Sequence, residues 1–170
     1  MRDLFELAHK ELLIKSDGTL VRKRSVGRAV AGQEAGWLGN NGYISLSLGG
    51  RKYLAHRIVF LMTHGFMPDQ VDHINGVRTD NRPENLRASD ATTNKWNSAN
   101  ASKRSSTGVR GVSWHKAAQK YCVQIMCNGS KKYLGLYETL EDAKIAREKA
   151  EVKMFGEFAP KREALAGMEV

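Results

Sequence analysis

The chain has 170 residues, enough for one full domain or two small ones, and its 27 lysines and arginines outnumber 18 acidic residues to give a formal net charge of +9. This excess favours a polyanionic partner, and because no apolar stretch approaches the length of a membrane span, no membrane association is expected. The two cysteines, Cys122 and Cys127, are too few for a four-thiolate zinc site, so we expect no structural zinc and a reduced, cytosolic setting.

The first part of the chain is predicted to be a short helix followed by turn-rich β structure. The helix is expected over residues 2–13. Apolar and polar residues alternate over residues 42–48, as in a half-buried strand, and two glycines then form a hairpin turn into a strand over residues 51–54. A helix over residues 55–64, closed by Gly65, completes this part.

The most informative stretch is VDHINGVRTDNRPENLRASDATTNKWN, residues 71–97. In it Asp72 precedes His73, and two amides, Asn85 and Asn94, follow. A divalent cation that prefers hard oxygen ligands can take them from Asp72 and from the side-chain carbonyl of Asn94. Histidine is the natural base for activating water near neutral pH. Surface loops are also rich in Asn, Asp, Gly and Pro, so the Asp-His pair alone is a weak signal.

The whole string resembles the HNH endonuclease family, specifically its phage and intron-encoded homing-type branch. In that branch a hairpin and a helix containing His-Arg, which stands at residues 56–57 here, precede the catalytic loop. The resemblance is carried by hydrophobic-Asp-His at 71–73, Asn-Gly at 75–76, Asp-Asn-Arg at 80–82, Asn-Leu-Arg at 85–87 and Asn94.

The resemblance implies an α+β fold with a ββα-metal (His-Me finger) nuclease core. Two short strands flank the loop after His73, and a helix that carries Asn94 and starts at residues 88–91 follows. His73 is then the general base, and Asp72 and Asn94 hold a single Mg²⁺ or Mn²⁺ ion. Asn85 ties the loop together by hydrogen bonds and so positions His73.

Basic residues on either side of this loop are candidates for contacts with the DNA backbone. Arg57 either reaches a phosphate or forms a salt bridge, and the sequence favours neither alternative. Residues 98–107 are small and polar and are predicted to form a linker, whose Lys103 and Arg104 lie along phosphates.

Residues 108–160 are predicted to form a compact module, a small three-stranded antiparallel sheet packed on one helix, followed by a tail over residues 161–170. The strands are expected over residues 109–114, 121–127 and 131–137, with an Asn-Gly hairpin turn between the last two. The exposed face of such a sheet carries every second residue of each strand.

The helix of this module is expected to start at Thr139, with Asp142 completing a capping box. Trp114 and Tyr121 are predicted to face the helix and to belong to the core. The apolar stripe of the helix is predicted to consist of Ala143, Ala146, Ala150 and Met154.

The charge pattern of the module fits a nucleic-acid-binding sheet. Seven Lys or Arg residues and no Asp or Glu occur between Ser98 and Tyr137, although a solvated lysine-rich sheet would show the same pattern. The module resembles the plant ethylene-response-factor (APETALA-type) DNA-binding domain in Arg110-Gly111-Val112, Lys120-Tyr121 and Tyr133-Leu134-Gly135. In that family the exposed sheet face lies in the major groove. The positions that this resemblance places on the DNA are Arg110, Ser113, His115, Gln124, Met126, Lys131 and Tyr133.

These features together predict a nuclease domain over residues 1–97 and a DNA-binding domain over residues 108–160. The expected function is metal-dependent cleavage of double-stranded DNA by a phage homing-type enzyme, acting as a monomer in the cytoplasm of a bacterial or phage-infected cell. A DNA-binding regulator with a silent nuclease site would have lost Asp72, His73 or Asn94, and all three are present. An RNA-binding or RNA-cutting protein would display more exposed aromatic side chains for stacking.

Overall fold

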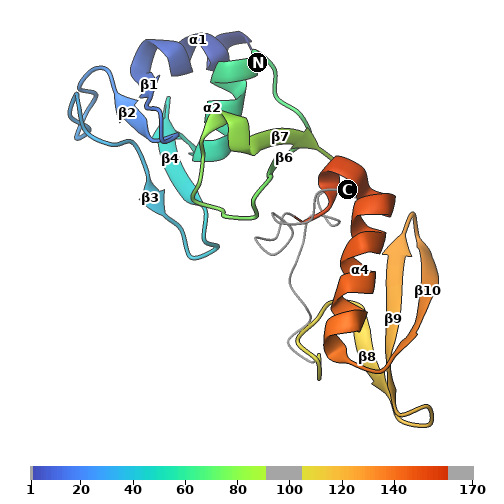
Figure 1. The fold of residues 1–170 in the computed structure, drawn as a ribbon. Helices are drawn as coiled ribbons and strands as arrows, with labels where there is room; N and C mark the ends of the chain where they lie inside the picture. The colour runs from blue at the N-terminus through green and yellow to red at the C-terminus, as the bar shows by residue number, and fades with distance from the viewer. Residues whose placement is uncertain (1, 91–104, 161–170) are drawn as a thin grey trace. The chain divides into compact units, whose positions relative to one another are not determined.

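The computed structural model describes residues 2–90 and 105–160. The chain divides into two compact units, Met1–Asp90 and Ala91–Val170, each of which mixes helix and sheet (Figure 1). No helix within the described ranges is long and apolar enough to cross a membrane. Asn94, Lys103, Arg104 and the tail over residues 161–170 lie outside the described residues.

The first unit opens with a helix and a short hairpin. The helix α1 (Arg2–Glu11) ends two residues before the position predicted, because Leu12 already pairs with Arg22 in the hairpin of β1 (Leu12–Ile14) and β2 (Leu20–Arg22). Leu12 is fully buried, so the strand contributes to the core and competes successfully with continuation of the helix.

A three-stranded antiparallel sheet follows, formed by β3 (Trp37–Leu38), β4 (Ile44–Leu48) and β5 (Arg51–Leu54), with β4 in the centre. The predicted strand at residues 42–48 begins two residues late because Gly42 has φ 79 and belongs to the preceding turn. The predicted hairpin into residues 51–54 is confirmed.

The helix α2 (Ala55–His64) is the centre of the first unit, and its predicted bounds are confirmed. It ends at Gly65, which has φ 76 and donates its N–H to the carbonyl of Leu61. One core packs α1, the hairpin, β4 and the strands after α2 around it. Its fully buried members include Ala8, Leu12, Leu46, Ile58 and Val59.

Two antiparallel strands, β6 (Gln70–His73) and β7 (Leu86–Ser89), follow α2 and flank a loop that ends in the short 3-10 helix η1 (Pro83–Asn85). Their register pairs His73 with Leu86 and Asp72 with Arg87. The pairing continues through Ala88 and Ser89, so the prediction that a helix starts at residues 88–91 is wrong at these two positions. Ala88 and Ser89 pair instead with Val71 and Gln70 of β6, and this pairing holds them in a strand.

Within residues 105–160 the second unit forms a three-stranded antiparallel sheet with one long helix. The strands β8 (Val112–His115), β9 (Lys120–Cys127) and β10 (Ser130–Tyr137) lie in the order β10-β9-β8, and α4 (Leu140–Phe155) and the short η2 (Gly156–Phe158) follow. The Asn128-Gly129 turn is confirmed, with φ values of 50 and 74. The first strand starts at Val112 rather than at residue 109, because Gly111, with φ 76, turns the chain beforehand.

The helix α4 has the predicted cap but not the predicted buried face. Thr139 accepts a hydrogen bond from the N–H of Asp142, which confirms the cap. Of the predicted stripe, only Ala143 is fully buried, while Ala150 and Met154 are partly buried. The other buried positions are Arg147, Glu151 and Phe155.

A charged pair therefore lies where an apolar stripe was expected. Arg147 and Glu151 are each 2% exposed and pair at 3.2 Å, and the Nε of Arg147 also donates to the backbone carbonyl of Arg110. The bond to Arg110 ties α4 to the segment before β8. The prediction that Trp114 belongs to the core is wrong: it is 40% exposed on the edge strand β8 and contacts the ring of Tyr121 at 4.8 Å.

Candidate active site

His73 ends β6 with its ring buried and hydrogen-bonded. Its Nε2 lies 3.1 Å from the Oδ1 of Asn81, and the residue is only 4% exposed. An amide oxygen only accepts hydrogen bonds, so Nε2 carries the ring hydrogen and Nδ1 carries the lone pair. The contact with Asn81 therefore selects the tautomer in which Nδ1 can accept a proton.

The surroundings of His73 also keep its ring uncharged near neutral pH. Burial has the largest influence and lowers the pKa of His73 below its ordinary 6.5. The bond with Asn81 and the carboxylates of Asp72 and Asp80 oppose this, and the charge of Arg78 adds to it. An imidazole with a lowered pKa is mostly unprotonated at pH 7, as a general base must be.

Asp72, the neighbour of His73, is paired across the two strands. Its Oδ2 accepts hydrogen bonds from the Nε of Arg87 at 3.1 Å and from the Nη2 of Arg87 at 2.8 Å. The two side chains are 8% and 12% exposed, so the pair is largely desolvated. Two bonds from one guanidinium restrict the rotation of the carboxylate and so fix the direction of its oxygens.

The side chain of Asn85 bridges the two ends of the loop over residues 74–85. Its Oδ1 accepts from the backbone N–H of Asn75 at 3.0 Å, while its Nδ2 donates to the Oδ1 of Asn75 at 3.0 Å and to the carbonyl of Asp80 at 2.8 Å. The backbone carbonyl of Asn85 accepts from Ile74. Since Asn81 follows Asp80, these bonds set the position of the residue that contacts His73.

A second set of bonds stabilises the same loop from outside. Asp80 accepts from the Nε and Nη2 of Arg82 at 2.8 and 2.7 Å and from the Nδ2 of Asn75 at 2.7 Å. The bonds from Arg82 are the main reason why the pKa of Asp80 falls to about 2. Asp80 is therefore ionised throughout the neutral range and stays bonded to both partners.

Three further residues, Asn81, His56 and Tyr43, contact His73. None of them was assigned a role at the site from the sequence. Asn81 lies inside the Asp-Asn-Arg motif but was given no function. The rings of His56 and Tyr43 lie 4.9 and 5.9 Å from that of His73, and 5.2 Å from one another. The His-Arg pair at residues 56–57 was the available signal for His56, whereas nothing local marked Tyr43.

The stability of the protein is expected to fall in acid because of His56. Burial, which leaves its Nδ1 without a hydrogen-bond partner, lowers the pKa of His56 from 6.5 to about 3. The unfolded chain then binds more protons between these values, so the free energy of unfolding declines by up to about 1.4 kcal/mol per pH unit as the pH drops below 6.5. Urea unfolding in EDTA between pH 7 and pH 4 measures this slope.

The matched variants for this prediction are His56→Phe and His64→Phe. Phenylalanine keeps a ring at position 56 but does not titrate, so His56→Phe should flatten the slope. His64 is exposed on the same helix, and its replacement should leave the slope unchanged. Because the pKa of His73 is also lowered, a residual slope is expected in His56→Phe. Equal slopes in wild type and His56→Phe would contradict the prediction.

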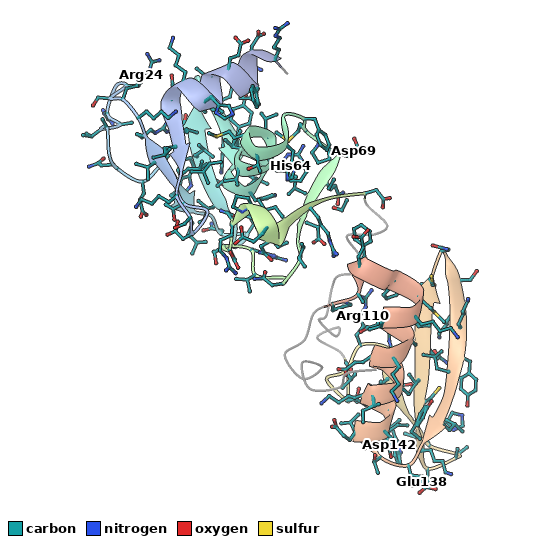
Figure 2. All side chains as sticks on the ribbon, turned by 45° about the horizontal axis from the view of Figure 1, so that its top comes forward. Arg24, His64, Asp69, Arg110, Glu138 and Asp142 are labelled. Atoms are coloured by element: carbon teal, nitrogen blue, oxygen red, sulfur yellow. The ribbon has the colours of Figure 1, made fainter. Side chains whose placement is uncertain are left out.

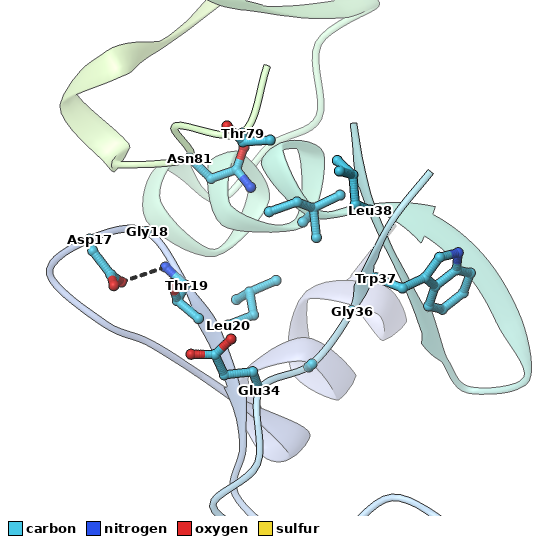
Figure 3. Close-up of a pocket in the computed structure, with 13 residues that line it drawn as sticks. Asp17, Gly18, Thr19, Leu20, Glu34, Gly36, Trp37, Leu38, Thr79 and Asn81 are labelled. Carbon is cyan, nitrogen blue, oxygen red and sulfur yellow. Dashed lines mark hydrogen bonds between the residues drawn. The ribbon is translucent and has the colours of Figure 1, made fainter. Parts of the chain in front are cut away.

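Behind Asn81 lies a cavity of about 270 Å³, which the turn between β1 and β2 closes (Figure 3). Asp17 and Glu34 line it together with apolar groups, so it does not suit a phosphate backbone. Gly18 in this turn has φ 80 and packs against the loop: a Cβ here would lie 2.1 Å from the carbonyl carbon of Asn81. The turn and the loop over residues 74–85 therefore approach each other through a glycine.

Gly18→Ala is expected to destabilise the protein and displace Asn81. Gly32→Ala is the matched control, because Gly32 has φ 83 but a Cβ there would meet nothing within 4 Å. The control carries only the left-handed backbone penalty of about 1 kcal/mol, and Gly18→Ala should cost at least about 2 kcal/mol more, through steric overlap with backbone atoms. Chemical unfolding of both variants measures the difference. Equal losses of stability in the two variants would show that the turn accommodates the added methyl group at position 18 without cost.

Arg57 forms hydrogen bonds with backbone carbonyls rather than a salt bridge among the described residues. Its Nη1 donates to the carbonyl of Asp69 and its Nη2 to the carbonyl of Pro68, both at 3.0 Å. The salt-bridge alternative is therefore wrong, because the carbonyls of the segment before β6 occupy the guanidinium. A contact between Arg57 and a phosphate stays a prediction.

The second unit gathers most of the predicted DNA contacts on one sheet face. Figure 2 draws the side chains and labels one of these candidates, Arg110. The register places Ser113 opposite Cys122 and Tyr133 opposite Gln124, all on the face away from Val123 and the core. A hollow of about 370 Å³ brings together Arg110, Ser113, Gln124 and Lys131. His115 and Tyr133 are exposed outside this hollow, and Met126 is exposed within it.

Residues 53–95 match the family model described as HNH endonuclease. The match runs from the end of β5 through α2 to β7 and includes Asp72, His73, Asn85 and also Asn94. It supports a nuclease function and a DNA substrate for the first unit. Comparisons with curated proteins and with solved structures gave no match. The likeness of the second unit to the ethylene-response-factor domain stays a prediction.

Proposed function

We propose that this protein is a metal-dependent endonuclease that hydrolyses phosphodiester bonds in double-stranded DNA. The observation that carries the proposal is the bond between Asn81 and the Nε2 of His73, inside a loop that matches the HNH family. It leaves the Nδ1 lone pair for proton transfer on a buried ring whose pKa is lowered. In this tautomer Nδ1 can accept a proton, which is what a general base must do.

In the proposed reaction the Nδ1 of His73 takes the proton of a water molecule that attacks the phosphorus. The amide of Asn81 keeps the ring oriented and stabilises the positive charge that the ring then acquires. Asn85 acts through the loop by holding Asp80 and Asn81 in place. This assigns Asn85 a positioning role rather than a contact with the substrate.

The donor chemistry of the site fits a single Mg²⁺ or Mn²⁺ ion. Asp72 offers a carboxylate oriented by Arg87, and Asn94, which lies outside the described residues, is the proposed second ligand. No group of three or more His, Cys, Asp or Glu residues is clustered within the described ranges. A small number of protein ligands suits Mg²⁺, because this ion keeps several water molecules and substrate oxygens in its coordination shell. A bound cation supplies Lewis-acid stabilisation of charge on the leaving 3′ oxygen.

The second unit is proposed to add DNA affinity and some sequence preference. Its basic sheet face carries Ser113, Gln124, Lys131 and Tyr133 in positions suited to a groove. Two modest DNA binders in one chain raise the overall affinity through effective concentration. We propose that the protein is a homing-type enzyme that acts as a monomer in a bacterial or phage-infected cell.

Conversion of supercoiled plasmid tests the proposed function. Wild type is incubated with Mg²⁺, Mn²⁺ or EDTA, and the products are separated on a gel. Metal-dependent open circles would establish nicking, and linear product would establish cleavage of both strands. Retained DNA binding in a shift assay without cleavage of any DNA would instead favour a DNA-binding regulator with a silent nuclease site.

A further inference from the structure

Arg78 is an exposed side chain that is nevertheless held in place. Its guanidinium carbon lies 5.0 Å from the centre of the Tyr43 ring, and its Nη1 donates to the carbonyl of Asn41 at 2.9 Å. The side chain also passes over Gly42, where a Cβ would make ordinary van der Waals contact with the Cδ and Nη1 of Arg78 at 3.6 and 3.7 Å. A long, exposed arginine is ordinarily free to rotate, so these contacts restrict it before any ligand binds.

The charge of Arg78 stands beside the proposed base. The Tyr43 ring on which it stacks lies 5.9 Å from the ring of His73. The positive charge of Arg78 is also near enough to act on the ionisation of His73. Arg78 and His73 therefore both lie next to the ring of Tyr43.

The groups that hold Arg78 do not neutralise it. A ring face and a backbone carbonyl are uncharged, and one of its five N–H donors is bonded among the described residues. The neighbouring arginines differ: Arg82 pairs with Asp80, Arg87 pairs with Asp72, and Arg57 donates to two carbonyls. Arg78 thus combines a fixed position with a charge and donors available to an anion.

We propose that Arg78 binds a backbone phosphate of the DNA strand that His73 attacks, which rests on the proposed nuclease function. A guanidinium presents parallel N–H donors that match the oxygens of a phosphate. Stacking on Tyr43 reduces the entropy lost on binding, because the side chain is already ordered. The contact places the phosphodiester over the site formed by Asp72 and His73.

The test compares Arg78→Ala and Arg78→Lys with Arg28→Ala, which removes the same charge from an exposed loop position. Cleavage in Mg²⁺ gives kcat/KM, and DNA binding in EDTA at several salt concentrations gives the dependence of log K on log salt. Arg78→Ala should lower kcat/KM by ~10–100-fold and reduce the magnitude of the salt slope by about one, the signature of one lost phosphate contact. Arg78→Lys should keep most of the slope but recover cleavage only in part.

The two measurements separate failure of this inference from failure of the proposed function. If wild type cleaves and Arg78→Ala matches Arg28→Ala in both kcat/KM and salt slope, the phosphate contact is overturned. If wild type cuts no DNA but Arg78→Ala alone lowers the slope, the endonuclease is overturned and the phosphate contact stands. Equal thermal midpoints of the three variants show that the fold is retained.

Discussion

Replacing His73 with alanine is expected to abolish DNA cleavage while DNA binding persists. Loss of a general base typically costs ~10²–10⁴ in rate, and among the described histidines only His73 is hydrogen-bonded to the loop over residues 74–85. Phosphate contacts from other residues do not depend on the imidazole, so affinity should change little. Plasmid conversion in Mg²⁺, together with a shift assay in EDTA, measures both quantities.

His73→Gln and His64→Ala are the controls for this prediction. Glutamine can donate to Asn81 as the Nε2 of His73 does, but its amide cannot take a proton at neutral pH, so His73→Gln should fold and remain inactive. His64 is exposed at the end of α2, and its replacement should leave cleavage unchanged. Cleavage by His73→Gln at the wild-type rate would show that another group activates the water.

Asp72→Asn is expected to impair both stability and metal-dependent cleavage. The substitution removes the negative charge opposite Arg87, a pair whose side chains are only 8% and 12% exposed. Breaking one side of a buried pair costs about 3–5 kcal/mol, because the remaining charge stays desolvated. The neutral amide is also a weaker ligand for Mg²⁺ than a carboxylate, so cleavage should need far more metal or cease. Urea unfolding and a Mg²⁺ titration of the cleavage rate measure the two effects.

Arg87→Met separates the structural role of Asp72 from its role toward the metal. This variant breaks the same ion pair but keeps the carboxylate, so it should lose comparable stability and still cleave DNA at low temperature. The double variant Asp72→Asn with Arg87→Met removes both charges and should regain stability without regaining activity. If Asp72→Asn cleaves with the Mg²⁺ dependence of wild type, Asp72 is not a ligand.

The local features of this fold could be read from the sequence because local chemistry determines them. The helix α2 ends at Gly65, where only a left-handed backbone closes the last turn. The Asn128-Gly129 turn and the Thr139 cap depend on residues no more than three positions apart. The predictions that failed involve competition between distant segments: β6 draws Ala88 and Ser89 into a strand, and Arg147 and Glu151 fill a face of α4 that alanines were expected to form.

The same distinction between local chemistry and contacts of distant segments applies to the candidate site. Asp72, His73 and Asn85 were predicted from residue types within one short string together with its resemblance to the HNH family. The tertiary structure alone placed Asn81 against Nε2, Tyr43 and His56 beside the ring, and Arg87 against Asp72. Burial and partners from separate elements set a tautomer and a pKa, so the sequence determined which groups are present and the fold decided their protonation and orientation.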